Sequence, residues 1–215
     1  MSVRVLVADD HGAIRDGLRL MLEADPEIEV VGEAADRAAA VRNARALRPD
    51  VVLMDVRMPG TDGIEATRAV VAEGLADVLV LTTFDIDEYV FGALRAGAAG
   101  FLLKSVDSAT LRDAVRRVGA GEGVVAPEVT RRLLAAFVDV PEPAAVEPPP
   151  GLEDLTARER EVLACLALGL SNAEIGHRLA ITEATAKTHV SRVLTKLGCT
   201  SRVQAAILAR SAGLG

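Results

Sequence analysis

Residues 51–63 read VVLMDVRMPGTDG and place one carboxylate, Asp55, directly after four apolar residues. An apolar run without polar alternation is typical of a strand that is buried on both faces of a parallel sheet. Pro59, Gly60 and Gly63 follow Asp55 closely, and residues of these types favour a tight loop. The segment therefore predicts a parallel sheet with Asp55 at the edge where its strands end.

The same pattern recurs along residues 1–120, where short apolar runs alternate with amphipathic stretches. Alternating strands and helices of this kind predict an α/β fold, a doubly wound five-stranded parallel sheet, in which ligands collect at the carboxyl ends of the strands. The strands are predicted at residues 3–8, 29–34, 51–55, 77–82 and 100–104, and the helices at 13–23, 37–48, 63–73, 86–96 and 106–118, with a further helix at about 127–138.

A proline-rich segment divides the chain. Residues 139–150, DVPEPAAVEPPP, hold five of the nine prolines. Proline removes amide donors and fixes φ, so this segment predicts a stiff, extended spacer. We therefore expect a first domain at 1–120, a helix and linker at 121–150, and a small all-α domain at 151–215.

The net charge of -7 argues against a uniformly basic nucleic-acid binder. The charge is unevenly distributed, however. Residues 151–215 carry eight basic and six acidic groups and are the only part with a basic excess. A partner with negative charge is therefore expected for this part of the chain alone.

Helix start signals replace the strand signals after the spacer. The stretch 182–197, TEATAKTHVSRVLTKL, has apolar residues on one face and polar or basic residues on the other. A short helix and a tight turn before it indicate a helix-turn-helix, although a small helical bundle has similar outer faces. The capping signals are Thr156-x-x-Glu159, Ser171-x-x-Glu174 and Ser201-x-x-Gln204, with Thr182 as the cap of the remaining helix.

Polar side chains gather at the predicted carboxyl ends of the strands: Asp9 and Asp10, Asp55, Thr82 and Thr83, and Lys104. Carboxylates that crowd one edge repel one another unless a cation lies among them, and their hard oxygens suit Mg²⁺. A lysine and a hydroxyl nearby would hold phosphate oxygens, and an aspartate can be the nucleophile of phosphoryl transfer. These side chains predict Mg²⁺-assisted phosphorylation of one aspartate.

Over residues 3–118 the chain resembles the receiver domain of two-component response regulators, through VADD at 7–10, LMDVRMPGTDG at 53–63, LTT at 81–83 and GFLLK at 100–104. The resemblance implies that this domain has a flavodoxin-like fold and that a sensor histidine kinase phosphorylates Asp55 with Mg²⁺ as cofactor. It also implies that Asp10, Asp55 and the main-chain carbonyl of Arg57 bind Mg²⁺, that Asp9 holds a metal-bound water, that Thr82 and Lys104 bind phosphoryl oxygens, and that Phe101 is an aromatic switch.

Residues 152–209 closely resemble the LuxR-type DNA-binding domain, and the two domains together are typical of the NarL/FixJ family. The resemblance implies that the 182–197 helix enters the major groove of double-stranded promoter DNA, and that the active form is a homodimer with the 201–212 helix as dimerisation element. Base contacts are expected from Lys187, Thr188 and Ser191, and phosphate contacts from Arg192, Lys196 and His189.

Two alternative functions are considered from the residues alone. A phosphatase with an aspartate nucleophile normally has a second acid two residues later as general acid, but Val56 and Arg57 follow Asp55, so we expect no enzyme. The second is a receiver whose helical domain binds protein instead of DNA. His11 is interpreted as a solvated loop histidine, in preference to a metal ligand or a phosphohistidine.

The cysteines and the hydropathy indicate the cellular setting. Cys165 and Cys199 lack CxxC spacing, which favours reduced packing cysteines. Two aspartates lie within the first ten residues, which argues against a signal peptide. No apolar run approaches the roughly 20 residues that cross a bilayer, so we expect a cytoplasmic protein with no membrane contact.

Overall fold

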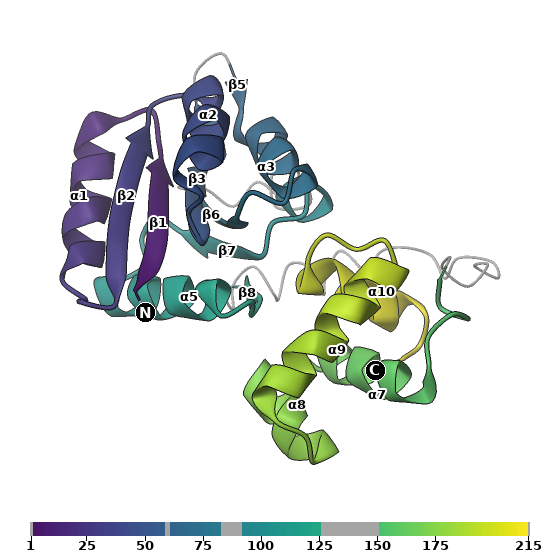
Figure 1. Cartoon of the computed structure of the whole chain (residues 1–215). Coiled ribbons are helices and arrows are strands. Elements are labelled where there is room, and N and C mark those ends of the chain that lie inside the picture. Colours follow the sequence, from purple (N-terminus) through teal and green to yellow (C-terminus); the bar gives the residue numbers. More distant parts are fainter. Residues whose placement is uncertain (1, 59–60, 83–91, 126–150, 215) are drawn as a thin grey trace. The chain divides into compact units, whose positions relative to one another are not determined.

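The computed structural model describes residues 2–58, 61–82, 92–125 and 151–214 (Figure 1). The chain divides into two compact units, Met1–Arg132 and Leu133–Gly215. The first contains both strands and helices, and the second is helical throughout its described elements. The limits predicted at 120 and 150 and the helix predicted at 127–138 stay predictions, because residues 126–150 lie outside the described part of the chain.

A parallel sheet forms the centre of the first unit. Its strands follow the order β2-β1-β3-β6-β7-β8, and every neighbouring pair is parallel. The bounds are β1 Val3–Ala8, β2 Ile28–Ala34, β3 Val51–Asp55, β6 Asp77–Thr82, β7 Gly100–Leu103 and β8 Val124–Val125. The first five strands confirm the predicted sheet, and β8 adds a short sixth strand. Because β2 and β3 lie on opposite sides of β1, the strand order reverses there, which is where such sheets bind ligands.

Helices cover both faces of this sheet, as expected for a doubly wound fold. Helix α1 packs against α5, and α2 packs against α3. The bounds are α1 Gly12–Glu23, α2 Arg37–Leu47, α3 Gly63–Ala72 and α5 Ser108–Gly119. Of the helix predicted at 86–96, residues 92–95 are helical, and residues 83–91 lie outside the described residues.

The sheet is held by aliphatic packing. Strand β3 is buried along its whole length, and Leu6, Leu79 and Phe101 have no exposed surface. Burying a side chain of this size stabilises the fold by about 1.5–3 kcal/mol. The apolar strands therefore fix the positions of the polar residues that follow them.

The second unit contains four helices in its described residues: α7 Ala157–Ala167, α8 Asn172–Leu179, α9 Glu183–Lys196 and α10 Arg202–Ser211. Each begins after a predicted cap: Thr156, Ser171, Thr182 and Ser201 each accept a hydrogen bond from the amide three residues later. The reciprocal capping box is complete at the starts of α7 and α8. Each cap satisfies an amide without an intrahelical partner and contributes about 1 kcal/mol.

The interior of this unit is built mainly from aliphatic residues such as Leu163, Ile175 and Val193. Cys165 and Cys199 are free thiols. Burial raises the pKa of both thiols, which keeps them protonated and suits a packing role. Within the described ranges, the structure contains no helix with both the length and the apolarity to cross a membrane.

Candidate functional site

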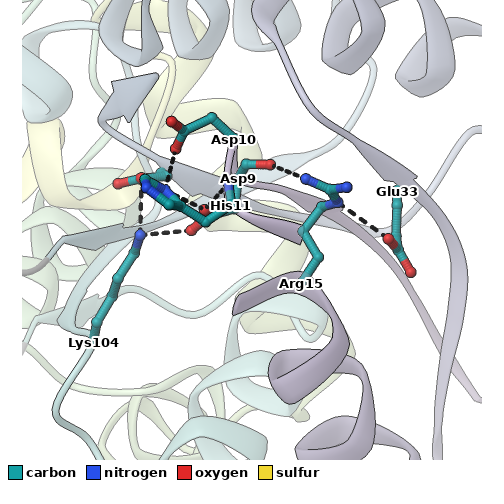
Figure 2. Close-up of polar contacts among 7 residues, drawn as sticks. Asp9, Asp10, His11, Arg15, Glu33 and Lys104 are labelled. Atoms are coloured by element: carbon teal, nitrogen blue, oxygen red, sulfur yellow. Dashed lines mark hydrogen bonds and ion pairs between the residues drawn. The ribbon is translucent and has the colours of Figure 1, made fainter. Parts of the chain in front are cut away.

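The carboxyl ends of β1, β3 and β7 bring three predicted site residues together, of which Figure 2 labels Asp9 and Lys104. Strands β1 and β3 are neighbours, so Asp9 and Asp55 both emerge at the same edge. Lys104, directly after β7, places Nζ 2.5 Å from Asp9 Oδ2 and 2.8 Å from Asp55 Oδ2. One ammonium group therefore bridges two carboxylates that lie far apart in the sequence.

This bridge is largely withdrawn from solvent. Asp9 is 1% and Asp55 4% exposed, and the Lys104 side chain is 12% exposed. Burial alone lowers the pKa of Lys104, but its hydrogen bonds to Asp55 and Asp9 outweigh this effect, so the net pKa is raised. Lys104 thus stays charged at neutral pH and partly neutralises the two carboxylates.

Asp10 and His11 continue the acidic edge toward solvent. Asp9 Oδ1 accepts a hydrogen bond from the His11 amide at 2.9 Å, and Asp10 Oδ1 lies 2.8 Å from His11 Nδ1. The three residues place potential ligand atoms within 4.8 Å of one another. The His11 side chain is 67% exposed, which is the environment expected of a solvated loop histidine.

The donor set at this edge fits a divalent cation. Asp9, Asp10 and Asp55 supply hard carboxylate oxygens, which Mg²⁺ prefers. Three carboxylates and one ammonium group leave a net excess of negative charge at the edge, and an added cation would offset the repulsion among them. Arg57, the predicted main-chain ligand, begins the short strand β4 Arg57–Met58 that follows this edge. Its side chain lies outside the described part of the structure.

Thr82 and Phe101 occupy the two strands beyond β3. Thr82 ends β6 and is 1% exposed, and its carbonyl accepts a hydrogen bond from the Lys104 amide at 2.7 Å. Phe101 lies in β7, opposite Val80 of β6, and has no exposed surface. Thr83, also predicted at this edge, lies outside the described residues. Phe101 therefore lies in the strand that leads to Lys104, and Thr82 lies in the neighbouring strand.

The loop after Asp55 turns back onto the strand that precedes it. Strand β4 pairs with β5 Thr61–Asp62, and the Gly63 amide donates to Val56 O at 3.1 Å. A Cβ atom on Gly63 would collide with the Asp55 carbonyl oxygen and would lie 2.8 Å from Val56 Cα. Only glycine permits this approach, so Gly63 fixes the path of the chain beside Asp55. Pro59 and Gly60 lie outside the described residues.

Three residues behind the acidic edge, Arg15, Arg19 and Glu33, were not predicted as site residues from the sequence. Arg15 Nη1 donates to the Asp9 carbonyl oxygen at 2.7 Å, and Arg15 Nε donates to Glu33 Oε2 at 3.1 Å (Figure 2). Arg19 Nε donates to the other oxygen of Glu33 at 2.9 Å. This network ties the Asp9 main chain to α1 and β2. Glu33, the second of two acidic residues in the strand sequence IEVVGEA, was the signal available in the sequence.

The second candidate site is formed by α8, the turn after it, and α9. Helix α8 ends at Leu179 and is capped by Ala180, which adopts the left-handed conformation with φ 53°. A Cβ atom on Gly176 would lie 2.9 Å from Ile181 O, so glycine allows the turn to pass close to α8. The result is two helices joined by a short turn, which is the predicted helix-turn-helix.

The outer face of α9 presents most of the predicted DNA contacts. Lys187, Thr188, Ser191 and Arg192 are exposed, while Ala186, Val190 and Val193 face the core. The Thr188 hydroxyl donates to Ala184 O at 3.0 Å. Because this bond turns the hydroxyl back to its own helix, the methyl group is the part of Thr188 that remains for an apolar contact.

His189 and Lys196, which were also predicted to contact phosphate, differ from these four residues in burial or in hydrogen bonding. His189 is half-buried, and its Nδ1 is buried without a hydrogen-bond partner among the described residues. Lys196 Nζ lies 2.7 Å from Glu159 Oε2 and 3.0 Å from Asp154 O. Lys196 is therefore joined to its own domain through two of its hydrogen-bond donors.

Two family models match the chain. The response regulator receiver domain matches residues 5–116, and the bacterial regulatory proteins of the luxR family match residues 153–209. These matches contain the acidic edge in the first unit and the helix-turn-helix in the second. They confirm the family that the sequence motifs resemble.

Relatives match this chain along nearly its whole length. The transcriptional regulatory protein LiaR of Bacillus subtilis is 44% identical, with 96% of each chain covered. The DNA-binding transcriptional activator DevR/DosR of Mycobacterium tuberculosis is 40% identical, with 96% of this chain and 94% of the relative covered. A solved structure of two RcsB dimers bound to two parallel DNAs is 25% identical, has a TM-score of 0.57, and covers 98% of this chain and 99% of that chain.

These relatives are regulators of transcription, and the match extends over both units of the chain rather than over one. The family is one of signalling proteins and transcription factors, not of enzymes, as the residues after Asp55 had indicated. The chain belongs to the two-component response regulators that join a receiver domain to a LuxR-type helix-turn-helix, and it is a DNA-binding transcription regulator of the LuxR/NarL class.

Proposed function

We propose that a sensor histidine kinase phosphorylates Asp55 in a Mg²⁺-dependent reaction, and that this modification promotes dimer formation and promoter binding. The observation that carries the proposal is the pairing of Asp55 Oδ2 with Lys104 Nζ at 2.8 Å. Asp55 stands at the end of a fully buried strand beside a second carboxylate, Asp9, and the same ammonium group contacts both. A receiver domain takes its phosphoryl group from a kinase, which supports the partner class.

The chemistry follows from the groups at this edge. A carboxylate oxygen of Asp55 attacks the phosphorus of a phosphohistidine, so an O–P bond forms while the N–P bond breaks, and the released imidazole takes up a proton from water. The Lys104 ammonium group can then donate to an oxygen of the transferred phosphoryl group instead of to a carboxylate. This exchange of acceptors keeps Lys104 paired before and after the reaction.

Asp10, Asp55 and the Arg57 carbonyl would hold Mg²⁺, and Asp9 would hold a water on the metal. These are oxygen donors of the kind that Mg²⁺ takes, and Asp10 is the most exposed of the three carboxylates, at 14% for its side chain. When bound, Mg²⁺ neutralises negative charge on the phosphoryl group during transfer. The exposed side of Asp10 leaves this edge accessible to the donor.

Thr82 and Phe101 are proposed to communicate the modification. Thr82 would move toward the phosphoryl group and donate its hydroxyl, and Phe101 would repack into the volume that Thr82 leaves. Both side chains are buried, at 1% and 0% exposure, so a displacement of one requires adjustment of its neighbours. Such a switch requires a difference in stability between two packings and no change of fold.

In the helical unit, Lys187, Thr188 and Ser191 are proposed to face the bases. Lys187 would donate to guanine O6 or N7, and the Thr188 methyl would contact a thymine methyl. Arg192 and His189 would contact phosphates and set the register of α9 on the duplex. Lys187, Thr188 and Ser191 are exposed on one face of α9, which supports this assignment.

Dimer formation is the proposed point of control. A single helical unit has a charge of only +2, from eight basic and six acidic groups, so its binding should be weak and sensitive to salt. Two units on a two-fold site bind much more tightly than one. The RcsB structure described above contains dimers on DNA, and α10 is proposed as the dimerisation element here.

The first experiment tests the acceptor. The full-length protein is incubated with acetyl phosphate and Mg²⁺, and the intact mass is measured. We expect one phosphoryl group on the wild type and on Asp113→Asn, an exposed aspartate of α5 that serves as matched control, and none on Asp55→Asn. Labelling that survives in Asp55→Asn would refute the assignment.

The second experiment tests the output. A duplex from the gene's own upstream region is used in a gel shift with and without acetyl phosphate. We expect tighter binding and a dimeric complex with the phosphodonor. If the phosphorylated protein dimerises but shifts neither this duplex nor a panel of promoter fragments, a helical unit that binds protein becomes the better hypothesis.

A further inference from the structure

Glu159 in the first turn of α7 is a buried carboxylate for which the proposed function gives no role. Its residue exposure is 4%. Three donors converge on one oxygen, Oε2: the Thr156 amide at 2.8 Å, the Thr156 hydroxyl at 2.9 Å, and Lys196 Nζ at 2.7 Å. Buried carboxylates are rare unless they are paired, so the lysine partner is essential to this arrangement.

Lys196 is the last residue of α9, and its surroundings belong to its own domain. Nζ also donates to Asp154 O at 3.0 Å. The main chain of Lys196 is covered as well, since a Cβ atom on Gly151 would collide with the Lys196 carbonyl oxygen. Residues 151–159 therefore contact both the side chain and the main chain of Lys196 at the C-terminal end of α9, although the Lys196 side chain remains 34% exposed.

The same turn of α7 holds the other helix of the helix-turn-helix. Arg158 Nη2 donates to Leu179 O, the carbonyl at the end of α8, at 2.5 Å. Arg158 Nη1 is held by Glu161 Oε2 at 2.7 Å. Two successive residues of α7, Arg158 and Glu159, thus contact the C-terminal ends of α8 and α9.

We propose that Glu159 and Lys196 are positioning residues for DNA recognition: the pair fixes the direction of α9 relative to α7, and Lys196 acts through Glu159 instead of contacting DNA phosphate. This inference rests on the proposed function of α9 as the helix that reads bases. Lys196, for which the resemblance implies a phosphate contact, is then a positioning residue. Glu159 has a role beyond the cap of α7.

Helix geometry explains why the contact matters at a distance. Lys187 precedes Lys196 by nine residues, which is roughly 13 Å along an α-helix. A tilt of α9 by roughly 5° about its C-terminal end would move Lys187 by about 1 Å, and displacements of this size degrade a contact that depends on geometry. Charged contacts with phosphate tolerate such a displacement better than hydrogen bonds to base edges do.

The two roles of Lys196 make different predictions in a double-mutant cycle. The variants are Lys196→Met, Glu159→Gln and the double variant, all in the full-length protein. Gln at this position can still complete the capping box, so Glu159→Gln removes the ion pair with little effect on the cap. If Lys196 acts through Glu159, the single variants and the double variant have similar effects, because the second change removes nothing further.

DNA binding is measured on the gene's own upstream duplex and on a duplex of unrelated sequence, across a series of salt concentrations. We expect each variant to lose specific affinity by about tenfold, to lose little non-specific affinity, and to keep the salt slope of the wild type. A phosphate contact predicts instead that Lys196→Met weakens both duplexes equally, lowers the salt slope by about one, and is not reproduced by Glu159→Gln. That result would overturn the proposal.

Amide hydrogen exchange provides a readout that does not depend on DNA. The ion pair predicts faster exchange at the end of α9, including the Leu197 amide that donates to Val193 O, in both single variants. Unchanged exchange there would overturn the proposal whatever the DNA result. If exchange rises as expected but the wild type prefers no promoter duplex over unrelated DNA, then the proposed function of α9 fails and the positioning contact stands.

Discussion

Lys104 Nζ lies 2.8 Å from Asp55 Oδ2, so the proposed phosphate acceptor is already paired with the cation that would hold the phosphoryl group. The ammonium group also contacts Asp9. In the absence of phosphate, Lys104 therefore compensates part of the charge at the edge where Mg²⁺ is proposed to bind. Lys104 thus has two roles: it would bind the phosphoryl group after transfer, and it stabilises the carboxylates before transfer.

Lys104→Met should destabilise the protein in the absence of divalent cations, by about 2 kcal/mol, because Asp9 and Asp55 then lose a charged hydrogen-bond partner. Mg²⁺ should restore more stability to the variant than to the wild type, since it becomes the main compensating charge. Denaturant unfolding with chelator and with Mg²⁺ measures both quantities. Equal Mg²⁺ increments in the two proteins would contradict this role, and Lys187→Met, an exposed lysine of α9, should change neither.

Gly63→Ala should destabilise the receiver by about 1–3 kcal/mol and slow phosphorylation, because the new methyl group collides with the Asp55 carbonyl oxygen. Gly17→Ala is the matched control. Gly17 lies within α1, and apart from the adjoining residues and main chain of its own helix no atom lies within 4 Å of the added Cβ, so alanine should stabilise that helix by about 0.5–1 kcal/mol. Thermal unfolding and the rate of acetyl-phosphate labelling test both variants. A neutral effect of Gly63→Ala would show that the loop can relax.

Lys187→Ala should weaken binding to the specific promoter duplex by about 1–3 kcal/mol, as expected for loss of a base contact, with a much smaller loss on unrelated DNA. Arg192→Ala provides the contrast. A phosphate contact at Arg192 should weaken both duplexes alike and lower the salt slope by about one. Titrations of each variant against both duplexes distinguish the two patterns, and equal losses for Lys187→Ala would assign Lys187 to phosphate.

The helical unit should lose stability in acid through Glu159. Hydrogen bonds from Lys196 and Thr156 lower the pKa of Glu159 from 4.5 to about 2. A lowered pKa means that the carboxylate stabilises the fold above pH 4.5 and that this contribution disappears as the pH falls to about 2. Glu159→Gln should therefore be less stable than the wild type at neutral pH, and the difference should shrink across this window. If the stability difference between Glu159→Gln and the wild type does not depend on pH, the negative charge of Glu159 is not the cause of that difference.

The sequence contained enough information to predict the acidic edge. Asp9, Asp55 and Lys104 each follow an apolar run, and parallel pairing of those runs brings their ends to one side of the sheet. Similar local reasoning located three of the four caps of the helical unit, because a hydroxyl followed by an acid or amide three residues later has a local physical meaning. The fourth, Thr182, was predicted as a hydroxyl residue directly before a helix that begins with an acidic residue. Local patterns and strand direction were sufficient for these features.

Other features depend on packing that no local pattern encodes. Strand β8 and the β4–β5 pair are two residues per strand, which is too short for any periodicity. The contact of Arg15 with the Asp9 carbonyl depends on how α1 lies against β2. Lys196 was predicted from the family resemblance to contact phosphate, but its long side chain reaches back to Glu159. Side chains of this length allow more than one partner, and only the fold decides between them.

The close approach of Gly151 to Lys196 has a consequence for protein engineering. Gly151 has φ +88°, and any Cβ there would collide with the Lys196 carbonyl oxygen. Gly151, which follows the proline-rich spacer, is thus an integral part of the helical DNA-binding unit. A chimaeric regulator that receives this output module should therefore be spliced upstream of Gly151, since a junction placed after it would discard the residue on which the end of α9 rests.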